Sequence, residues 1–341
     1  MLRPILIALL LGLLLAAAVP FPVLNPVISP VTTSLRGVSA VSATTAWVSG
    51  ADGTVLLTTD AGKTWERKSV PDTEKLDFRD VQGFDARAAV IMSAGPGAAS
   101  RVYRTTDGGA TWKLVLQNPD ADGFFDGLAF WDARRGMLIG DPVDGAFTLY
   151  GTEDGGASWT RVSGAPAAGQ GEGAFAASGT SLAVAEGGFA WFGTGGVKGG
   201  RVFRSTDWGA TWQAVETPIR HDGAAAGVFS VAFRDGKHGV AVGGDYQKGG
   251  EREGTAVVTD DGGLTWRVAA GAPGGYRSAV AWLDGKTVMC TGPSGSDISM
   301  DDGRTWKAWG EAGYHALSVV KGDGFATGSG GRIGRISAAG H

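Results

Sequence analysis

The sequence predicts an all-β protein, a single seven-bladed β-propeller whose last blade is closed by an N-terminal strand. Three observations predict this fold: a motif that occurs six times, a constant order of strand-like segments around each motif, and a shorter seventh copy near the C-terminus. Internal repeats of about 40–50 residues are typical of propellers, in which each repeat forms one four-stranded blade.

The motif Ser/Thr-x-Asp-x-Gly-x-Ser/Thr-Trp, which we call the Asp box, is the strongest signal in the sequence. Successive copies place their tryptophans 47, 47, 53, 54 and 40 residues apart, which is about the length of one blade. The aspartates and tryptophans of the six boxes are Asp60 and Trp65, Asp107 and Trp112, Asp154 and Trp159, Asp207 and Trp212, Asp261 and Trp266, and Asp301 and Trp306.

The residue types of the Asp box suit a tight turn between two strands. An aspartate carboxylate can accept hydrogen bonds from backbone N–H groups of its own turn. The glycine two positions later tolerates a positive φ, and the tryptophan can fill the wedge between sheets with its N–H available to a loop carbonyl. Because copies spread around a ring cannot converge on one centre, we interpret the boxes as structural, without a catalytic or metal-binding role.

The segments around each box repeat in a fixed order. Between Leu35 and Val70 we expect an inner strand, a second strand, a third strand that ends in the box, and an outer strand. The seventh copy has no box, and Pro26–Thr33 is predicted to complete it by pairing beside Arg332–Ser337, which removes the exposed sheet edges of an open arc. The inner strands are expected to begin at Leu35, Phe78, Phe125, Ala174, Val228, Tyr276 and Tyr314.

Composition places the chain among globular proteins. Of its 341 residues 43% are hydrophobic and 19% are charged, which supplies a core and excludes a charged disordered chain. The net charge of −4 shows no basic excess, so nucleic acid is not expected as a partner. We divide the sequence into a signal peptide (1–18), an N-terminal segment with the ring-closing strand (19–34) and the propeller (35–341).

The first residues have the features of an export signal. Arg3 precedes the apolar run Ile5–Ala18, which ends in three alanines. A basic start, a short apolar run and small residues at its end are typical of a secretory signal peptide, with an uncleaved membrane anchor as the alternative. We therefore expect a periplasmic or extracellular protein. Cys290 is the only cysteine and lies in an apolar segment, so we expect a buried thiol and no disulfide.

Polar residues recur where the inner strands begin, at the entry to the predicted channel. The loops between blades and between second and third strands share this face, and the Asp boxes lie on the opposite face. Variable loops on a rigid scaffold are the usual place for a binding site, although these side chains have a second interpretation as solvated charges and channel-lining ion pairs. The candidate binding residues are Arg36, Arg79, Asp126, Glu172, Arg220, Asp245, Tyr246, Arg277 and His315.

The sequence contains no signature of a catalytic or cofactor site. The four histidines have no zinc-type spacing, and there is no nucleophile elbow, phosphate-binding loop or dinucleotide fingerprint. We therefore predict no cofactor, no bound metal and no catalytic residue.

The six boxes resemble bacterial-neuraminidase-type repeats. A single ring that carries them behind an export signal resembles the photosystem II stability/assembly factor family and its bacterial relatives, and the resemblance covers Leu35–Ile336. It implies a propeller that binds a membrane-protein assembly intermediate without performing chemistry. For this chain we therefore expect a monomer that binds a protein or membrane-protein complex in the cell envelope, with a carbohydrate as the alternative ligand.

A glycoside hydrolase that resembles sialidases is the alternative function. Sialidases need an arginine triad for a carboxylate, a Tyr/Glu pair and an acid/base aspartate. However, their arginine-bearing Phe-Arg-Ile-Pro motif is absent here, and they resemble six-bladed rings with fewer boxes. The residues of suitable type near the loop face are Arg36, Arg79, Arg277, Tyr276, Glu172 and Asp126.

Overall fold

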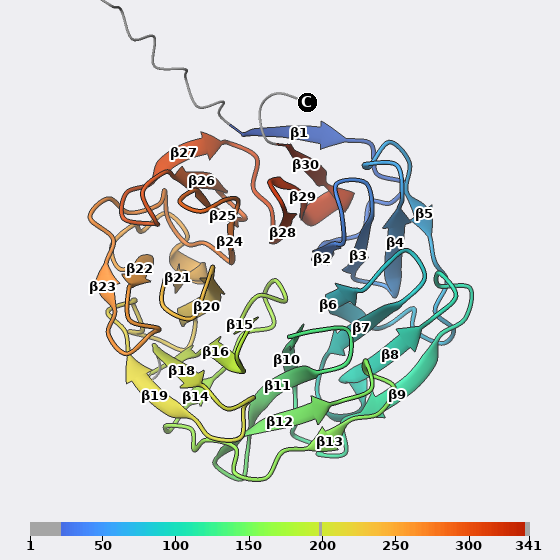
Figure 1. Cartoon of the computed structure of the whole chain (residues 1–341), viewed down its shortest axis with the longest axis horizontal. Coiled ribbons are helices and arrows are strands. Elements are labelled where there is room, and N and C mark those ends of the chain that lie inside the picture. The colour runs from blue at the N-terminus through green and yellow to red at the C-terminus, as the bar shows by residue number, and fades with distance from the viewer. Residues whose placement is uncertain (1–21, 198–199, 338–341) are drawn as a thin grey trace, which may run out of the picture.

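The computed structural model of the chain describes residues 22–197 and 200–337. Seven antiparallel sheets form a ring around a central channel, which confirms the predicted seven-bladed propeller (Figure 1). Six sheets have four strands, and the seventh has six because two short strands from the neighbouring blade join it. The predicted signal peptide, residues 1–18, lies outside the described residues. No helix in the described part is long and apolar enough to cross a membrane.

Apart from the outermost strand of blade 7, which comes from the N-terminus, the strands of each blade run in sequence order from the channel outward. Blades 1 and 2 contain β2 (Leu35–Ala40), β3 (Ala46–Gly50), β4 (Thr54–Thr58) and β5 (Glu66–Arg67), then β6 (Asp77–Gly83), β7 (Ala89–Ala94), β8 (Arg101–Thr105) and β9 (Lys113–Gln117). Blades 3 and 4 contain β10 (Phe125–Phe130), β11 (Gly136–Val143), β12 (Ala146–Thr152) and β13 (Thr160–Arg161), then β15 (Leu182–Ala185), β16 (Phe189–Gly193), β18 (Arg201–Ser205) and β19 (Gln213–Glu216).

The remaining blades follow the same order. Blades 5 and 6 contain β20 (Ala226–Phe233), β21 (Gly239–Asp245), β22 (Ala256–Thr259) and β23 (Arg267–Val268), then β24 (Ala279–Trp282), β25 (Val288–Gly292), β26 (Gly295–Ser299) and β27 (Lys307–Gly310). Blade 7 contains β28 (Ala316–Val320), β29 (Asp323–Thr327), β30 (Ile333–Ser337) and β1 (Val23–Val27). The elements outside this pattern are β14 (Glu172–Gly173), β17 (Gly195–Gly196) and the short 3-10 turns η1 (Gly97–Ala99), η2 (Tyr246–Lys248) and η3 (Ser329–Gly331).

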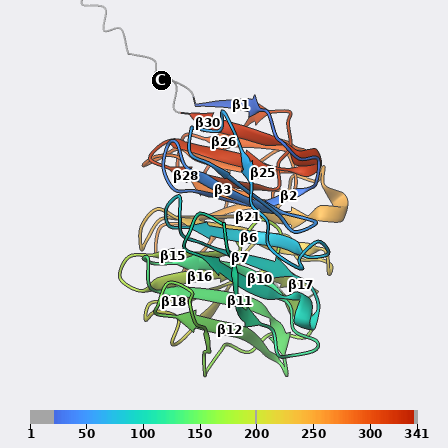
Figure 2. The same cartoon turned by 90° about the vertical axis from the view of Figure 1, so that its right-hand side faces the viewer.

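The N-terminal strand closes the ring, as predicted, but it lies earlier in the sequence than Pro26–Thr33. β1 pairs antiparallel with β30 from Val23 opposite Ser337 to Val27 opposite Ile333, and the two strands lie side by side in both views (Figures 1 and 2). The predicted position is wrong because Ile28–Ser34 has to carry the chain from the rim to the channel, where β2 begins. Hydrogen bonds from the Gly331 N–H to the Thr33 carbonyl and from the Leu35 N–H to the Gly328 carbonyl fix that crossing.

Two faces of the ring follow from the strand directions. The mouth face holds the starts of the inner strands and the turns between second and third strands, and in blade 1 these are joined by a bond from the Ala51 N–H to the Ser34 carbonyl. The box face holds the Asp boxes and the hairpins between first and second strands. In all six boxes the N–H of the fourth residue donates to a carbonyl of the hairpin in its own blade; in blade 1 this bond joins Ala61 and Thr44.

The Asp box of blade 3 illustrates how the motif builds its turn. The Asp154 carboxylate accepts bonds from the Ser158 N–H (2.9 Å), the Ser158 hydroxyl (2.6 Å) and the Thr152 hydroxyl (2.9 Å). Burial alone would raise the pKa of Asp154, but these hydrogen bonds to the ionised form together outweigh it and lower that pKa to about 2. The glycines of all six boxes have φ between 77° and 84°, in the region that favours glycine.

The box tryptophans pack as expected between blades, but their N–H groups do not generally bond to loop carbonyls. Trp212 and Trp306 donate to glycine carbonyls of their own boxes, at 2.9 Å each. Among the described residues the other four have buried N–H groups without a hydrogen-bond partner; they are Trp65, Trp112, Trp159 and Trp266. Their contribution is therefore apolar packing, as in the edge-on contact between Trp159 and Phe130.

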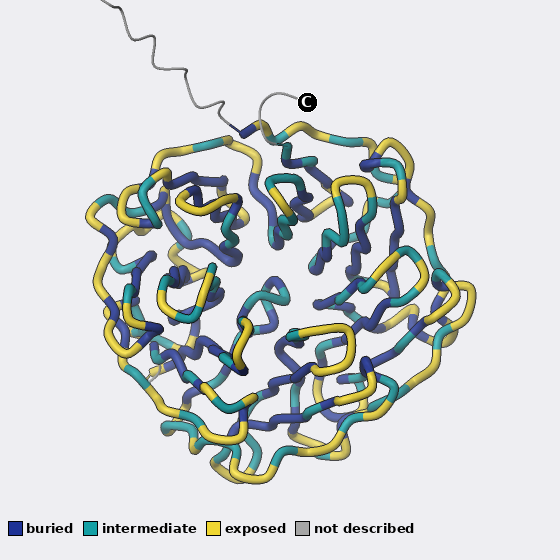
Figure 3. The backbone as a smooth tube through the Cα atoms, in the orientation of Figure 1, coloured by how far each residue is buried: buried dark blue, intermediate teal, exposed yellow. Residues whose placement is uncertain are grey.

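Burial follows the layers of each blade. The middle strands are almost wholly buried, whereas the outer strands are exposed around the rim (Figure 3). Trp47 on β3 and Trp191 on β16 are fully buried between blades, and their N–H groups donate to the carbonyls of Asp85 and Gly262. The contacts that hold the ring together are thus apolar wedges between neighbouring second and third strands.

We predict that Asp154→Ala lowers the free energy of unfolding by about 1–2 kcal/mol, because the Ser158 N–H and two hydroxyls lose their acceptor. Urea denaturation measures this change. Glu153→Ala is the matched control, because Glu153 is exposed and makes no side-chain hydrogen bond among the described residues, and we expect no change from it. An unchanged stability for Asp154→Ala would contradict the structural role of the box.

Candidate functional site

β-Bulges mark the entry to the inner strands on the mouth face. In blades 1, 2, 3 and 5 the pairing of the first two strands shifts register by one residue at this point. A bulge redirects one side chain out of the alternating pattern, and bulges often lie beside functional sites. The bulged residues are Arg36, Arg79, Asp126 and Phe229, and Arg277 and His315 occupy the corresponding positions of blades 6 and 7.

Several of these side chains meet at the mouth of the channel. The charges of Arg36 and Arg79 both act on Tyr276 and on His315, so the four groups share one region. The strands that carry the arginines approach closely, since a Cβ on Gly37 would lie 3.1 Å from the Asp80 Cα. We call the whole group the mouth cluster: Arg36, Asp77, Arg79, Tyr276, His315 and Arg332.

The mouth cluster carries more positive than negative charge. Asp77 pairs with Arg79, with 2.7 Å between Oδ2 and Nε. Neither Arg36 nor Arg332 has a carboxylate within ion-pair distance among the described residues, and the Arg36 Nε is buried without a hydrogen-bond partner. Burial and then the neighbouring Arg79 charge lower the pKa of Arg36 below its ordinary value.

The uncharged members of the mouth cluster are held neutral by their surroundings. Burial, followed by the charges of Arg36 and Arg79, lowers the pKa of His315 to about 4, so its imidazole is uncharged at neutral pH. Burial also raises the pKa of Tyr276 above its ordinary value. The Tyr276 ring packs edge-on against Phe229 at 4.8 Å and lies 6.4 Å from Tyr246, which is exposed.

Asp126 lies beside the mouth cluster but does not neutralise it. Its carboxyl group is buried, Oδ2 has no hydrogen-bond partner, and burial followed by the Asp141 charge raises its pKa well above the ordinary value. Burial raises the pKa of Asp141 as well. Asp141 and Phe175 line an adjacent cleft of about 790 Å³ on this face. Among the described residues, it is the Asp77 carboxylate that lies within ion-pair distance of Arg79.

Two predicted binding residues are buried in ion pairs and are not available to a partner. The Arg277 side chain is 4% exposed and its Nε lies 2.6 Å from Asp297 Oδ2. Glu172 pairs with Arg201 and also accepts a bond from the Thr194 hydroxyl. Arg277 occupies the position of the mouth residues in blade 6, whereas Glu172 lies before the inner strand of blade 4. In both cases a partner of opposite charge on the third strand draws the side chain into the blade. We do not retain either as a contact residue.

The other three predicted residues lie on or beside the loop that follows β21. Asp245 accepts a bond from the Gln247 N–H at 2.9 Å and lies 3.5 Å from the Lys248 Nζ. Arg220 pairs with Asp222 and with Glu251. Tyr246, 53% exposed, is the member of this loop that leaves an aromatic surface next to the mouth cluster.

The inner strand of blade 4 begins at Leu182, not at the predicted Ala174, because Phe175–Ser181 reaches into the channel. This segment is tied to other blades: the Arg79 Nη1 donates to the Ala176 carbonyl (3.0 Å), and the Ser178 hydroxyl donates to the Ser278 carbonyl (2.7 Å). It is drawn at the centre of the ring in Figure 1, and it forms one wall of a channel space of about 360 Å³.

Asp80 lies in this channel against the same segment. Its carboxylate accepts bonds from the Val81 and Leu128 N–H groups, and a Cβ on Gly179, which has φ +72°, would lie 2.3 Å from its Oδ1. Only glycine fits there. Burial raises the pKa of Asp80 from 3.8 to about 7.

The raised pKa of Asp80 predicts a specific pH dependence. The folded state binds this proton more tightly than the unfolded chain, so the resulting stabilisation is complete below about pH 4 and is lost as pH rises through about 7. Asp80→Asn removes the titration, and we expect the stability of the variant relative to the parent protein to increase between pH 4 and 7. Unfolding curves at several pH values measure this, and a constant difference would contradict the prediction. Asp126 and Asp141 are present in both proteins, so their contributions cancel in the difference between the two stabilities.

The sequence pattern points to Arg36, Arg79, His315 and Tyr246, but to Tyr276 only for the alternative glycoside hydrolase, and not to Phe229. Tyr276 and Phe229 occupy positions that an alignment of blades assigns to the first residues of a strand, where an apolar side chain is expected in any case. Asp80 follows Arg79 directly, and its only signal is that it is an acid on an inner strand. Within residues 22–197 and 200–337 no group of three or more acidic, histidine or cysteine side chains could hold a metal ion.

Comparisons with known proteins agree with the architecture. No protein-family model and no curated protein matches the chain. A solved structure of YCF48 bound to D1 peptide superposes with a TM-score of 0.64 at 16% identity over 95% of this chain and 98% of that one. YCF48 from Cyanidioschyzon merolae gives 0.63 at 18% identity over 92% and 98%.

An ancestral GH74 enzyme is also similar, with a TM-score of 0.62 at 15% identity. It covers 92% of this chain but only 46% of the enzyme, so the chain spans about half the length of that protein. At these identities the likeness concerns the fold. The chain thus shares its seven-bladed fold with YCF48, the photosystem II assembly factor, which is the resemblance that its sequence predicts.

Proposed function

We propose that this chain is an exported, non-enzymatic binding propeller that holds an acidic segment of a protein partner at the mouth cluster. The observation that carries the proposal is the uncompensated positive charge of Arg36 beside Arg79. A partly buried cation without a counter-charge is costly unless an anion binds there. A free site of this kind in the folded protein is therefore suited to an anionic ligand.

The composition of the mouth favours a protein over a small anion. Guanidinium groups bind carboxylates through two parallel hydrogen bonds, and Arg36 has donors that are not used by the protein. The exposed Tyr246 and the Tyr276 ring beside it add aromatic surface next to these donors. Arginine and tyrosine are enriched among the residues that contribute most to protein–protein binding.

The similarity to YCF48 supports a protein partner, because that propeller was solved bound to D1 peptide. The apolar run Ile5–Ala18 supports export, and the partner is then expected in the cell envelope. The proposal of a monomer rests on the N-terminal strand, which completes the last blade and leaves only the short outer strands as sheet edges at the rim.

We predict that Arg36→Glu weakens capture of the envelope partner at least tenfold, while Arg87→Glu, the same charge change on the box face, leaves capture unchanged. The introduced glutamate would pair with Arg79 and neutralise the mouth cluster from within, so the fold is expected to tolerate it. Affinity capture from an envelope fraction, with the bound protein quantified by mass spectrometry, measures the effect.

The opposite pattern would contradict the proposed face. If Arg36→Glu captured the partner normally and Arg87→Glu did not, the partner would bind the box face. Arg277 is unsuitable for this experiment because its buried pair with Asp297 would make loss of folding the expected result.

A glycoside hydrolase is the second candidate, favoured by two acids with raised pKa values, the buried Asp126 and the half-buried Asp141, beside the cleft of about 790 Å³. Such a pair could in principle supply an acid and a base. The binding proposal predicts no turnover of a panel of aryl glycosides. Turnover above background that is lost in Asp126→Asn would contradict the binding proposal and support a glycoside hydrolase.

A further inference from the structure

The box face carries a cleft of about 870 Å³ where blades 3 and 4 meet. Its walls are the hairpin between β10 and β11 and the Asp boxes of the two blades, with Trp131, Arg134, Arg135, Glu153 and Trp208 among the lining residues. This cleft lies on the opposite side of the ring from the mouth cluster. The short, similar turns of the box face do not lead one to expect a specific site there, but the side chains of this junction differ from those of the others.

Trp208 is a departure from the Asp-box pattern. The fourth residue of every box lies in the left-handed region, with φ between 62° and 78°, which costs free energy for any residue with a side chain and most for a bulky one. Trp208, with φ 63°, is the one large side chain among them. The six residues are Ala61, Gly108, Gly155, Trp208, Gly262 and Asp302.

The contacts of Trp208 do not bury it. Gly188 makes room for the indole, since a Cβ there would lie 2.8 Å from the Trp208 Nε1. The Arg135 guanidinium lies over the ring at 4.7 Å, and Trp131 packs edge-on at 5.4 Å. Even so, 41% of Trp208 remains exposed. A strained, half-open tryptophan contributes less to stability than the same residue in a core, which indicates a role in binding.

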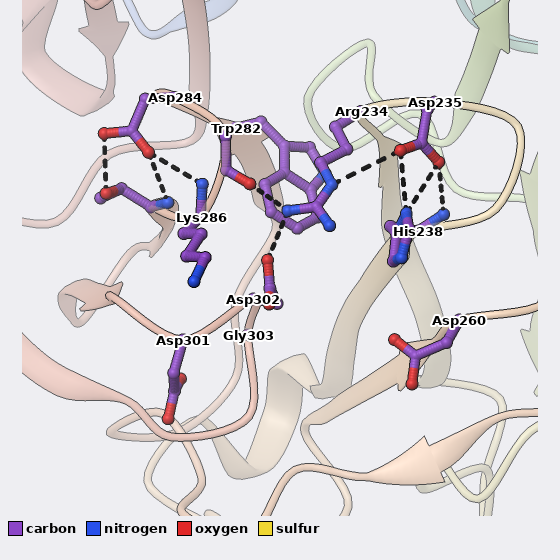
Figure 4. A network of polar contacts seen from close by, with 12 residues as sticks. Arg234, Asp235, His238, Asp260, Trp282, Asp284, Lys286, Asp301, Asp302 and Gly303 are labelled. Carbon is purple, nitrogen blue, oxygen red and sulfur yellow. Dashed lines mark hydrogen bonds and ion pairs between the residues drawn. The ribbon is translucent and has the colours of Figure 1, made fainter.

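At the junction between blades 5 and 6, the positions that correspond to Trp208, Trp131 and Arg135 hold residues that form ion pairs (Figure 4). There the fourth box residue is Asp302, and its carboxylate pairs with Arg234, which occupies the position of Trp131. Arg234 also lies over the Trp282 ring at 5.0 Å, and His238 at the position of Arg135 pairs with Asp235 at 2.8 Å. The Arg234–Asp302 ion pair therefore neutralises opposite charges across this junction.

The junction between blades 3 and 4 lacks an ion pair of this kind, and its Asp132 carboxylate accepts bonds from the Arg134 and Arg135 backbone N–H groups. Neither Arg134 nor Arg135 has a carboxylate within ion-pair distance in the described part of the chain. Asp154, which also lines the cleft, is already bonded to Ser158 and Thr152. Glu153 also lines the cleft, and its backbone carbonyl accepts a bond from the Arg134 Nε. The cleft thus presents two guanidinium groups that form no ion pair with a described residue, beside an open tryptophan edge.

We infer that this cleft is a second binding site, which takes an extended acidic peptide segment. Carboxylates of the segment pair with Arg134 and Arg135, and an apolar side chain packs on the exposed edge of Trp208. A saccharide is less suited, because Arg135 and Gly188 both lie against the indole and leave little flat surface for a sugar ring. The site is independent of the mouth cluster and of the function proposed for it.

Trp208→Gly is a clean test because three boxes carry glycine at this position, so the box turn itself favours the substitution. The probe is an array of acidic decapeptides with varied apolar residues, each printed beside its glutamine and asparagine counterpart. We expect acidic members to bind and their amide counterparts not to bind. Binding should fall at least tenfold in Trp208→Gly and in Arg135→Gln, with a melting temperature equal to or above that of the parent protein.

Ala61→Gly, a substitution to glycine at the corresponding position of blade 1 that changes no charge, is the matched control and should leave peptide binding unchanged. Arg36→Glu should also leave it unchanged, which separates this site from the mouth cluster. The inference is overturned if no acidic peptide binds in a Trp208-dependent manner, or if Trp208→Gly instead lowers the melting temperature as loss of a core residue does. It is also overturned if an anionic polysaccharide such as polygalacturonate binds there and the peptides do not.

Discussion

The convergence of seven inner strands on one narrow channel is the constraint on which the rest of the structure depends. Each blade widens outward, so apolar wedges fill the spaces between second and third strands, while the inner strands meet almost backbone to backbone. The inner strands of blades 1 and 2 are so close that a Cβ on Gly37 would lie 3.1 Å from the Asp80 Cα. The same crowding places Arg36 beside Arg79, although like charges repel each other. The geometry that closes the ring therefore creates its most unusual charged group.

Much of the fold is predictable because the repeat itself specifies it. A turn with two left-handed residues, an acid that bonds its amides and a packing tryptophan leave little choice of local structure. Six copies at blade spacing and a seventh copy without a box determine the number of sheets. The errors lie where no repeat constrains the chain. The sequence places β1 too late because the crossing from rim to channel has no pattern, and it misplaces the start of blade 4 because Phe175–Ser181 enters the channel through contacts with other blades.

The candidate site is predictable only in part, for a similar reason. Aligning the blades identifies Arg36, Arg79 and His315, but the same alignment gives Arg277 and Glu172 equal weight. What separates them is whether the third strand of the blade supplies an opposite charge: Asp297 on β26 and Arg201 on β18 do so, and no described residue forms an ion pair with Arg36. Such pairing joins residues about 20 to 30 positions apart and leaves no local pattern in the sequence. Trp208, by contrast, is visible as a departure from its motif.

The charge of Arg36 is uncompensated in the free protein, and stability measurements on two neutralising variants test this most directly. Arg36→Gln should leave the free energy of unfolding equal to or above that of the parent, because it removes repulsion with Arg79 and breaks no ion pair. Arg277→Gln should lower it by about 3–5 kcal/mol, because it leaves Asp297 buried without its partner. If Arg36→Gln destabilised the protein as strongly as Arg277→Gln, the charge would already be paired within the fold. The mouth cluster would then have no unmet need for an anion.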